Sequence, residues 1–93
     1  MKYQLFYTKR AISDLDRLDL KNSQRIIKKL KYFSEQPNPV EYSNPLKGIY
    51  QGLFRFRIGE YRIIFSRDSK GLLTLLTILT VKHRKDVYTK SNI

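Results

Sequence analysis

Residues 53–65 have the sequence LFRFRIGEYRIIF, which predicts a β-hairpin with two unlike faces. Two runs rich in aromatic and β-branched residues flank Gly59 and Glu60, and glycine at the first turn position supplies the positive φ that a type II′ turn needs. This turn fixes the register of the hairpin. The predicted cross-strand pairs are Ile58 with Tyr61, Arg57 with Arg62, Phe56 with Ile63, Arg55 with Ile64, and Phe54 with Phe65.

Because side chains alternate along a strand, one face of this hairpin is apolar and the other carries Arg55, Arg57 and Arg62 beside Ile64. Like charges directly opposite each other on one sheet face repel. A bound polyanion would relieve the repulsion, since phosphate oxygens accept paired hydrogen bonds from guanidinium groups. The alternative is a solvated basic face without a ligand, because charge patterning alone is a weak signal.

The composition describes a small, basic domain. The chain has 93 residues, of which 41% are hydrophobic and 13% aromatic, so residues 1–93 are expected to form a single domain around one core. The formal net charge of +11 is spread along the chain. The resulting positive electrostatic potential favours nucleic acid or an acidic protein as a partner.

The composition also argues against several kinds of site. There is no Cys, and one His with eight scattered acidic residues makes a metal site improbable. No apolar run approaches the ~20 residues that span a bilayer, and the N-terminal stretch lacks a secretory apolar region. We therefore expect a cytoplasmic protein that uses no metal or cofactor and has no membrane partner.

Two helices are predicted between a first strand at residues 2–7 and the hairpin. The first helix spans residues 9–18 and is capped by Thr8. A break at residues 20–22, with Asn22 or Ser23 as the next cap, leads into a second helix that ends near residue 35. So short a connection predicts an antiparallel helical hairpin. Lysines 28, 29 and 31 on the outer face are interpreted as steering charge, because no aromatic residue is interleaved with them.

The other segments complete an α+β fold. Residues 36–47 contain all three prolines and predict a loop, and residues 67–71 predict a polar turn. Residues 72–81, LLTLLTILTV, are apolar on both faces and predict an interior strand. The expected fold is an N-terminal strand, an antiparallel two-helix hairpin and a three-stranded antiparallel meander, forming a small, mainly antiparallel sheet.

The element order, the segment LKGIYQGLFRFRIGEYRIIF at residues 46–65 and the closing HRKDVY at residues 83–88 together resemble the RelE/ParE superfamily of type II toxin–antitoxin toxins. The resemblance covers essentially the whole chain. The closing motif is more similar to the RelE branch, whose toxins cut messenger RNA in the ribosomal A site, than to the ParE branch, whose toxins poison DNA gyrase.

The resemblance implies a RelE-like toxin domain that acts as a ribosome-dependent endoribonuclease, or mRNA interferase, and inhibits translation. The implied partners are a cognate antitoxin protein, mRNA and the ribosome with its rRNA. The alternative is a ParE-like toxin that binds and poisons DNA gyrase and carries out no chemistry.

The resemblance also implies roles for single residues. Arg55, Arg57 and Arg62 take the basic positions around the scissile phosphate. Tyr88 matches a C-terminal tyrosine that stacks on or orients a nucleotide, and His83 stands in the His-Arg pair of many relatives. The candidate catalytic residues are therefore Arg57, Arg62, His83 and Tyr88.

The candidate phosphate-binding residues are Arg55, Lys82, Arg84 and Lys85. Lys82 departs from the family pattern, since related sequences commonly have Gly directly before the histidine. Lys82 and Lys85 are alternative candidates for the acid or base, if crowding by like charges lowers a lysine pKa.

RNA cleavage by transesterification uses the 2′-hydroxyl of the substrate as nucleophile. The enzyme must remove its proton, stabilise a dianionic phosphorane and protonate the leaving 5′-oxygen. Arg57 and Arg62 suit the second task, because guanidinium groups are permanently charged, bidentate donors. His83 is the candidate acid or base, because the unperturbed imidazole pKa lies near 6.5; the alternative is an ordinary surface histidine. Glu60 is set aside as a solvated turn residue.

Overall fold

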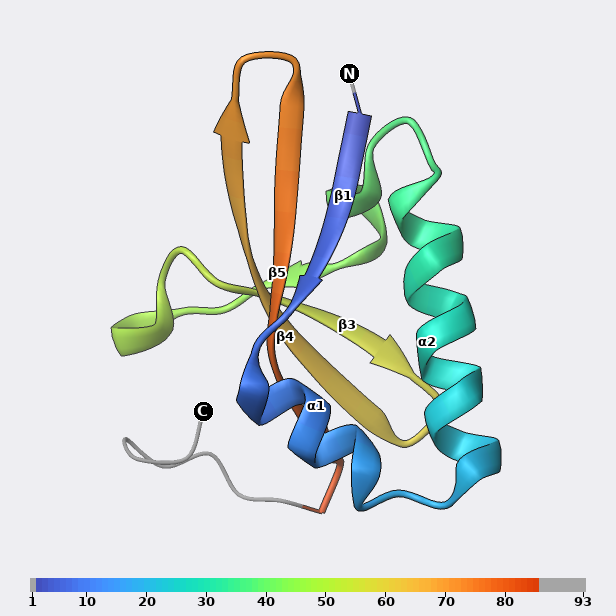
Figure 1. Cartoon of the computed structure of the whole chain (residues 1–93). Coiled ribbons are helices and arrows are strands. Elements are labelled where there is room, and N and C mark those ends of the chain that lie inside the picture. Colours follow the sequence, from blue (N-terminus) through green and yellow to red (C-terminus); the bar gives the residue numbers. More distant parts are fainter. Residues whose placement is uncertain (1, 86–93) are drawn as a thin grey trace.

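One mixed sheet with the strand order β1-β5-β4-β3-β2 is formed within residues 2–85, the part of the chain that this computed structural model describes (Figure 1). The long strands are β1 (Lys2–Tyr7), β3 (Phe54–Ile58), β4 (Tyr61–Lys70) and β5 (Leu73–His83). The helices are α1 (Lys9–Asp16) and α2 (Leu20–Ser34). The α+β class is therefore confirmed.

The sheet has more strands than the predicted three-stranded meander. The antiparallel order of β3, β4 and β5 is present, but β1 joins the other edge of β5 and runs parallel to it. A two-residue strand, β2 (Asn44–Pro45), pairs with Phe54 and Arg55 of β3 inside the segment predicted as a loop. Proline is tolerated there because β2 is an edge strand, and N–H groups on its outer side have no neighbouring strand to which they could donate.

The predicted register of the arginine hairpin is confirmed at all five pairs, from Ile58 with Tyr61 to Phe54 with Phe65. Gly59 has a φ of 59°, so the turn uses the conformational freedom that only glycine offers cheaply. The predicted turn at residues 67–71 is wrong. Residues 67–70 continue β4 and pair with β5, and the chain reverses after them at Gly71, whose φ is 60°. The polar composition there belongs to the exposed end of β4, where residues 67–70 all lie in exposed positions.

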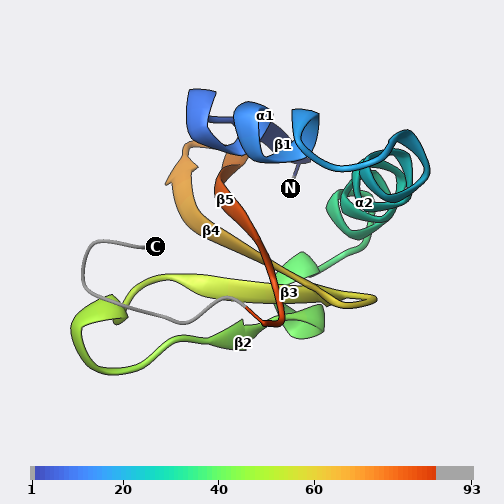
Figure 2. The ribbon, with the colours of Figure 1, turned by 90° about the horizontal axis from the view of Figure 1, so that it is seen from below.

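The helices differ from the prediction in their start and arrangement. Thr8 caps α1 as expected, with its Oγ1 accepting from the Ala11 N–H at 3.1 Å. Helix α2 begins earlier, at Leu20, because the Asp19 carboxylate accepts from the Asn22 N–H and caps it. Figure 2 shows α2 close to end-on while α1 lies across the view, so the helices cross and do not form an antiparallel hairpin.

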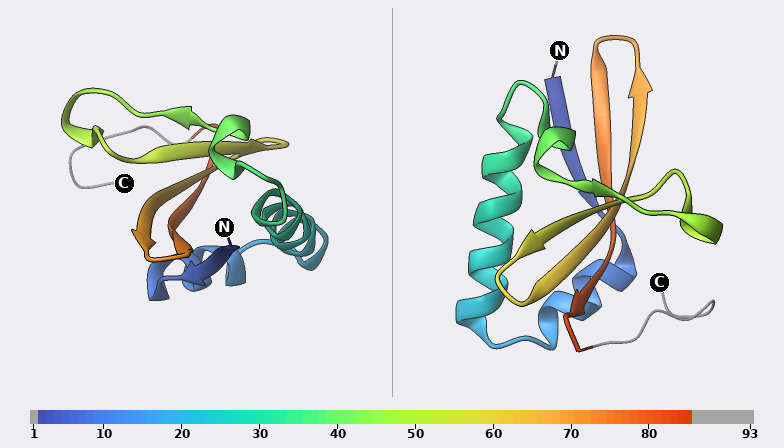
Figure 3. Two further views of the ribbon diagram at one scale, coloured as in Figure 1. Left: turned by 90° about the horizontal axis from the view of Figure 1, so that it is seen from above. Right: turned by 180° about the vertical axis from the view of Figure 1, so that it is seen from behind.

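The core lies between the helices and the apolar face of the sheet. Both helices lie on one side of β3 (Figure 3), and Phe33 of α2 stacks on Phe56 with ring centroids 4.6 Å apart. Phe56 in turn stacks on Phe65 at 4.2 Å. Strand β5 is interior, as predicted, with Leu76 and Ile78 fully buried. Neither helix within residues 2–85 is long and apolar enough to cross a membrane.

Candidate functional site

Three cationic side chains form a row across the sheet. Arg57 of β3 pairs directly with Arg62 of β4, and Arg62 pairs directly with Lys82 of β5. Paired residues of neighbouring antiparallel strands share a face, and the strands lie about 4.7–4.9 Å apart. We call these three residues the cationic row. The sequence predicts its first pair, and the β4–β5 register adds Lys82.

Arg55 lies two residues before Arg57 on the same face of β3, beside Ile64 of β4. Its side chain is partly buried, and its Nε is a buried donor without a hydrogen-bond partner among residues 2–85. A buried donor of this kind costs free energy unless a ligand or water accepts from it. Arg55 therefore extends the cationic row with an available donor.

Arg62 has a structural contact as well as its place in the row. Its Nη2 donates to the carbonyl oxygens of His83 at 3.0 Å and Arg84 at 3.1 Å. These bonds tie the middle of the row to the end of β5. The guanidinium group is therefore held in one orientation by the backbone that also carries His83.

His83 lies beside the turn of the arginine hairpin. Its Nε2 is 3.4 Å from the Glu60 Oε2, and its Nδ1 accepts the Lys85 N–H at 3.1 Å. From this pattern we assign the proton of the neutral ring to Nε2, which faces the carboxylate. The Tyr61 ring meets the imidazole edge-on, with centroids 5.3 Å apart. His83 is thus oriented by contacts on both nitrogens and on its ring.

Glu60, an exposed turn residue set aside from the sequence alone, makes contacts at the end of β5. Besides its contact with His83, its Oε1 lies 3.4 Å from Arg84 Nη2, and its carbonyl oxygen accepts the Arg84 N–H at 2.7 Å. The signal was hidden because it depends on the β4–β5 register. That register pairs Tyr61 with His83 and so brings the preceding turn residue to the end of β5.

These contacts enclose a small pocket of about 300 Å³. It is lined by Arg57, Gly59, Glu60, Tyr61, Arg62 and Arg84. Three of these residues are arginines, so the pocket suits a single anionic group such as a phosphate. We call it the phosphate pocket. Among residues 2–85 no group of His, Cys, Asp and Glu side chains is arranged to hold a metal ion.

The remaining predicted site residues are placed as follows. Lys82 is partly buried within the row, whereas Arg84 and Lys85 are exposed in the turn after β5. The structure thus brings Arg55, Arg57, Arg62, Lys82, His83 and Arg84 to one end of the sheet. Tyr88 lies outside the described residues, and its stacking role stays a prediction.

The sequence matches the family model of the ParE toxin of the type II toxin–antitoxin system parDE over residues 5–88. The chain belongs to this toxin family. The toxin has no match among curated protein sequences. Its fold is similar to a chain of the toxin–antitoxin complex RelBE2 from Mycobacterium tuberculosis, with 26% identity, a TM-score of 0.76, and coverage of 90% of this chain and 100% of that one.

Two further solved structures resemble the toxin. A chain of the archaeal RelE–RelB complex from Pyrococcus horikoshii has 25% identity and a TM-score of 0.66, covering 94% of this chain and 100% of that one. A chain of the intact Escherichia coli RelBE complex has 20% identity and a TM-score of 0.68, covering 90% and 99%. The toxin is thus a member of the RelE/ParE superfamily, as its sequence resemblance predicted.

Helix α1 of the toxin fixes the strand that carries Lys82 and His83. The β4–β5 register shifts between Ile64 and Phe65, which leaves Leu79 of β5 as a bulge. The Asp14 carboxylate accepts from the Thr80 hydroxyl at 2.7 Å and from the Val81 N–H at 2.9 Å. Because a bulge changes which way the following side chains point, this contact helps to direct Lys82 into the cationic row.

Proposed function

We propose that this toxin is a ribosome-dependent endoribonuclease that cleaves mRNA and inhibits translation. The observation that carries the proposal is the cationic row of Arg57, Arg62 and Lys82 next to the phosphate pocket, together with Glu60, which lines that pocket and contacts His83. A cluster of fixed positive charge with one adjacent titratable imidazole is what phosphodiester cleavage requires.

The proposed chemistry assigns each residue one task. The 2′-hydroxyl of the RNA attacks the adjacent phosphorus, and the bond from phosphorus to the 5′-oxygen breaks. Arg57 and Arg62 stabilise the dianionic phosphorane by charge and hydrogen bonds that are already in place. His83 transfers a proton at one of the two oxygens, and Glu60 orients its ring. Lys82 or Lys85 is the candidate for the other proton.

The partly assembled set of acid and base groups fits dependence on the ribosome. The toxin has one His in its whole sequence, and the attacking and leaving oxygens lie on opposite sides of the phosphorus, so one imidazole does not reach both. Positioning an RNA in a reactive geometry contributes a large rate factor by itself. In this proposal the ribosome supplies that positioning, while Arg55, Arg84 and Lys85 hold neighbouring phosphates and Tyr88 stacks on a base.

The proposed protein partner is a cognate antitoxin. The solved structures from Mycobacterium tuberculosis and Pyrococcus horikoshii are described as complexes of toxin with antitoxin. With a net charge of +11, this toxin is expected to bind an acidic segment that covers the basic face. Such a complex would keep the toxin inactive in the cytoplasm.

A second candidate function is favoured by the family model itself, which is that of the ParE toxin. In this alternative the toxin poisons DNA gyrase, and the cationic row contacts the protein or its DNA without any bond being broken. The two functions differ in what they do to transcripts, so one experiment separates them.

The test is induced expression of the toxin followed by mapping of transcript 5′ ends. We expect new ends at regular positions within translated codons, and none in the same transcript after its start codon is removed. The matched assay is supercoiling by purified gyrase, which the ribonuclease should leave unchanged. Loss of supercoiling without new transcript ends would overturn the ribonuclease proposal in favour of the alternative.

A further inference from the structure

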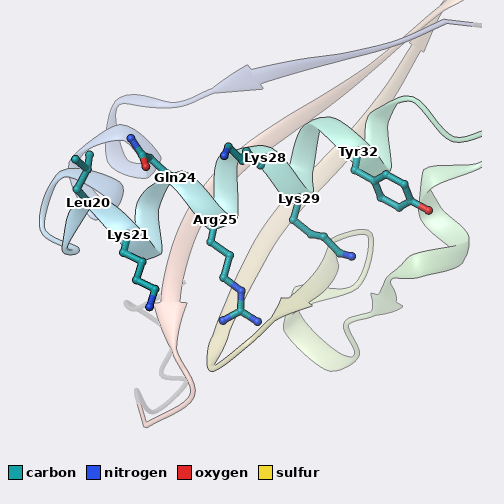
Figure 4. A pocket seen from close by; sticks show the side chains of 7 residues that line it. All are labelled: Leu20, Lys21, Gln24, Arg25, Lys28, Lys29 and Tyr32. Carbon is teal, nitrogen blue, oxygen red and sulfur yellow. The ribbon is translucent and has the colours of Figure 1, made fainter.

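Helix α2 carries a second cationic surface, which lies next to the turn of the arginine hairpin. A groove of about 810 Å³ runs along the helix (Figure 4) and is lined by Leu20, Lys21, Gln24, Arg25, Lys28, Lys29 and Tyr32. Lys21, Arg25 and Lys29 point to the same side of the helix. Residues four apart lie about 6 Å apart along a helix axis, so these three charges form a line. We call this surface the α2 groove.

The charges of this groove do not serve the stability of the helix. Helix α2 has 15 residues and contains no Asp or Glu, so its cations cannot form ion pairs along the helix. Lys21 and Arg25, and Arg25 and Lys29, are instead like-charged pairs at the spacing where such pairs destabilise. Lys21 also lies in the first turn, where the helix dipole disfavours a cation.

An aromatic side chain lies among these cations. Tyr32 lines the groove and is 48% exposed, and the Lys29 Nζ lies 5.1 Å from the centre of its ring. From the sequence alone the lysines at 28, 29 and 31 are expected to act as steering charge, because no aromatic residue is interleaved with them. In the structure Tyr32 lies beside Lys29, and cations next to an exposed ring are the elements that bind a phosphate backbone and a stacked base.

The α2 groove adjoins the phosphate pocket at one residue, Gly59. The guanidinium group of Arg25 lies against the turn of the arginine hairpin, so that a Cβ added at Gly59 would be only 2.8 Å from Arg25 Nη1. Gly59 also lines the phosphate pocket. Arg25 therefore lies between the two cationic surfaces, and a strand leaving the pocket at Gly59 would enter the groove.

We infer that the α2 groove binds the sugar–phosphate backbone of RNA and extends the contact made at the phosphate pocket. The inference rests on the proposed function for its choice of RNA as the ligand. The exposed Tyr32 ring and the junction at Gly59 favour RNA over an acidic polypeptide, which offers carboxylates but no base to stack. The site would hold RNA that lies beyond the cleaved bond.

The test compares two charge-matched triple variants in RNA binding. The groove variant is Lys21→Gln, Lys28→Gln and Lys29→Gln, and the control variant is Lys9→Gln, Arg67→Gln and Lys70→Gln, whose positions are exposed and lie away from both surfaces. Both lower the net charge by three. The probe is a fluorescein-labelled single strand of 2′-O-methyl RNA, which lacks the nucleophile and cannot be cleaved. Fluorescence anisotropy measures its affinity across salt concentrations.

We expect the groove variant to bind at least about tenfold more weakly than the control variant at low salt. Its plot of log affinity against log salt should be less steep by about 2, since each contact with a single strand contributes roughly 0.7 to the slope. Tyr32→Ala should weaken binding by about fivefold or more, whereas Tyr32→Phe keeps the stacking ring and should not. If the triple variant melts early, the single substitution Lys28→Gln should still lower the slope by about 0.7.

Equal RNA affinity for the groove and control variants would overturn the inference. So would a groove variant that keeps its RNA affinity but loses affinity for poly-L-glutamate, because the groove would then be a site for acidic polypeptide. Failure of the ribonuclease proposal is read separately, from transcript ends made by the unaltered toxin. Loss of RNA binding in the groove variant without any such ends would leave the groove assigned and the nuclease rejected.

Discussion

Arg57 and Arg62 lie directly opposite each other in the β3–β4 ladder, on the face of the hairpin that does not join the aromatic core. Two like charges that face each other across a strand pair destabilise a sheet. Two charges of opposite sign in the same positions would stabilise it by roughly 0.2–1 kcal/mol. Lys82 adds a third cation beside Arg62. A protein tolerates such an arrangement when a ligand supplies the missing negative charge. For Arg57, function and stability are therefore expected to respond differently to its removal.

Arg62→Ala should lower both stability and cleavage. The two hydrogen bonds from Nη2 to the His83 and Arg84 carbonyl oxygens are lost, and hydrogen bonds from a charged donor contribute about 1.5–3 kcal/mol each before the relief of repulsion is subtracted. Because the bond to the Arg84 carbonyl is exposed and screened by solvent, we expect a net loss of about 1–3 kcal/mol, mainly from the bond to the His83 carbonyl, and a fall in cleavage of about 100-fold. Thermal melts and ribosome-dependent cleavage measure the two effects. A variant as stable as the parent would show that the backbone contacts contribute no more than the relief of repulsion.

His83→Ala and Glu60→Gln should separate proton transfer from its orientation. Removing a general acid or base costs about 10²- to 10⁴-fold in rate, so His83→Ala is expected to fall in that range. Glu60→Gln keeps the shape of the side chain but removes the charge 3.4 Å from the imidazole, and we expect a smaller loss. Cleavage is measured as single-turnover rates on programmed ribosomes. Glu41→Gln, at another exposed glutamate, is the control and should cleave at the parental rate.

Tyr7→Phe should make the toxin more resistant to alkaline unfolding. Tyr7 lies at the end of β1 in a pocket lined by Ile12, Leu15, Asp16 and Ile27, and burial raises the pKa of its phenol above 10.0. The unfolded chain therefore loses this proton first as the pH rises through 10, and the folded state loses stability from there up to the folded pKa. The free energy of unfolding, measured with urea, should fall more for the parent than for Tyr7→Phe between about pH 9 and 11. If the stabilities of the parent and of Tyr7→Phe depend on pH in the same way, the Tyr7 phenol is exposed to solvent and its pKa is not raised.

The arginine hairpin was the most predictable part of the structure because a single residue determines it. Gly59 fixes the turn, the turn fixes the register, and the alternation of side chains then separates the core face from the arginine face. Strand β5 was predictable for a similar reason, since apolar residues on both faces require cover on both sides.

The features that the sequence did not reveal depend on contacts between distant segments. The Glu60 contact with His83 joins residues 23 apart, and the Asp14 contact with Thr80 joins residues 66 apart. The parallel pairing of β1 with β5 likewise links the two ends of the described chain. Local propensity contains no information about such pairs. The α2 groove was missed because Tyr32 was not considered together with the lysines that share its side of the helix.

Arg57→Ala tests the central claim most directly, because Arg57 lines the phosphate pocket at the edge of the cationic row. Arg67→Ala, at an exposed arginine on the distal part of β4, is the matched control. The measurement is ribosome-dependent cleavage of a defined mRNA, with the melting temperature recorded on the same samples. We predict that Arg57→Ala cleaves at least about 100-fold more slowly than the parent, while its stability is unchanged or slightly higher. Arg67→Ala should match the parent in both cleavage rate and stability. Parental cleavage by Arg57→Ala would contradict the account, because the cationic row would then have no part in the reaction.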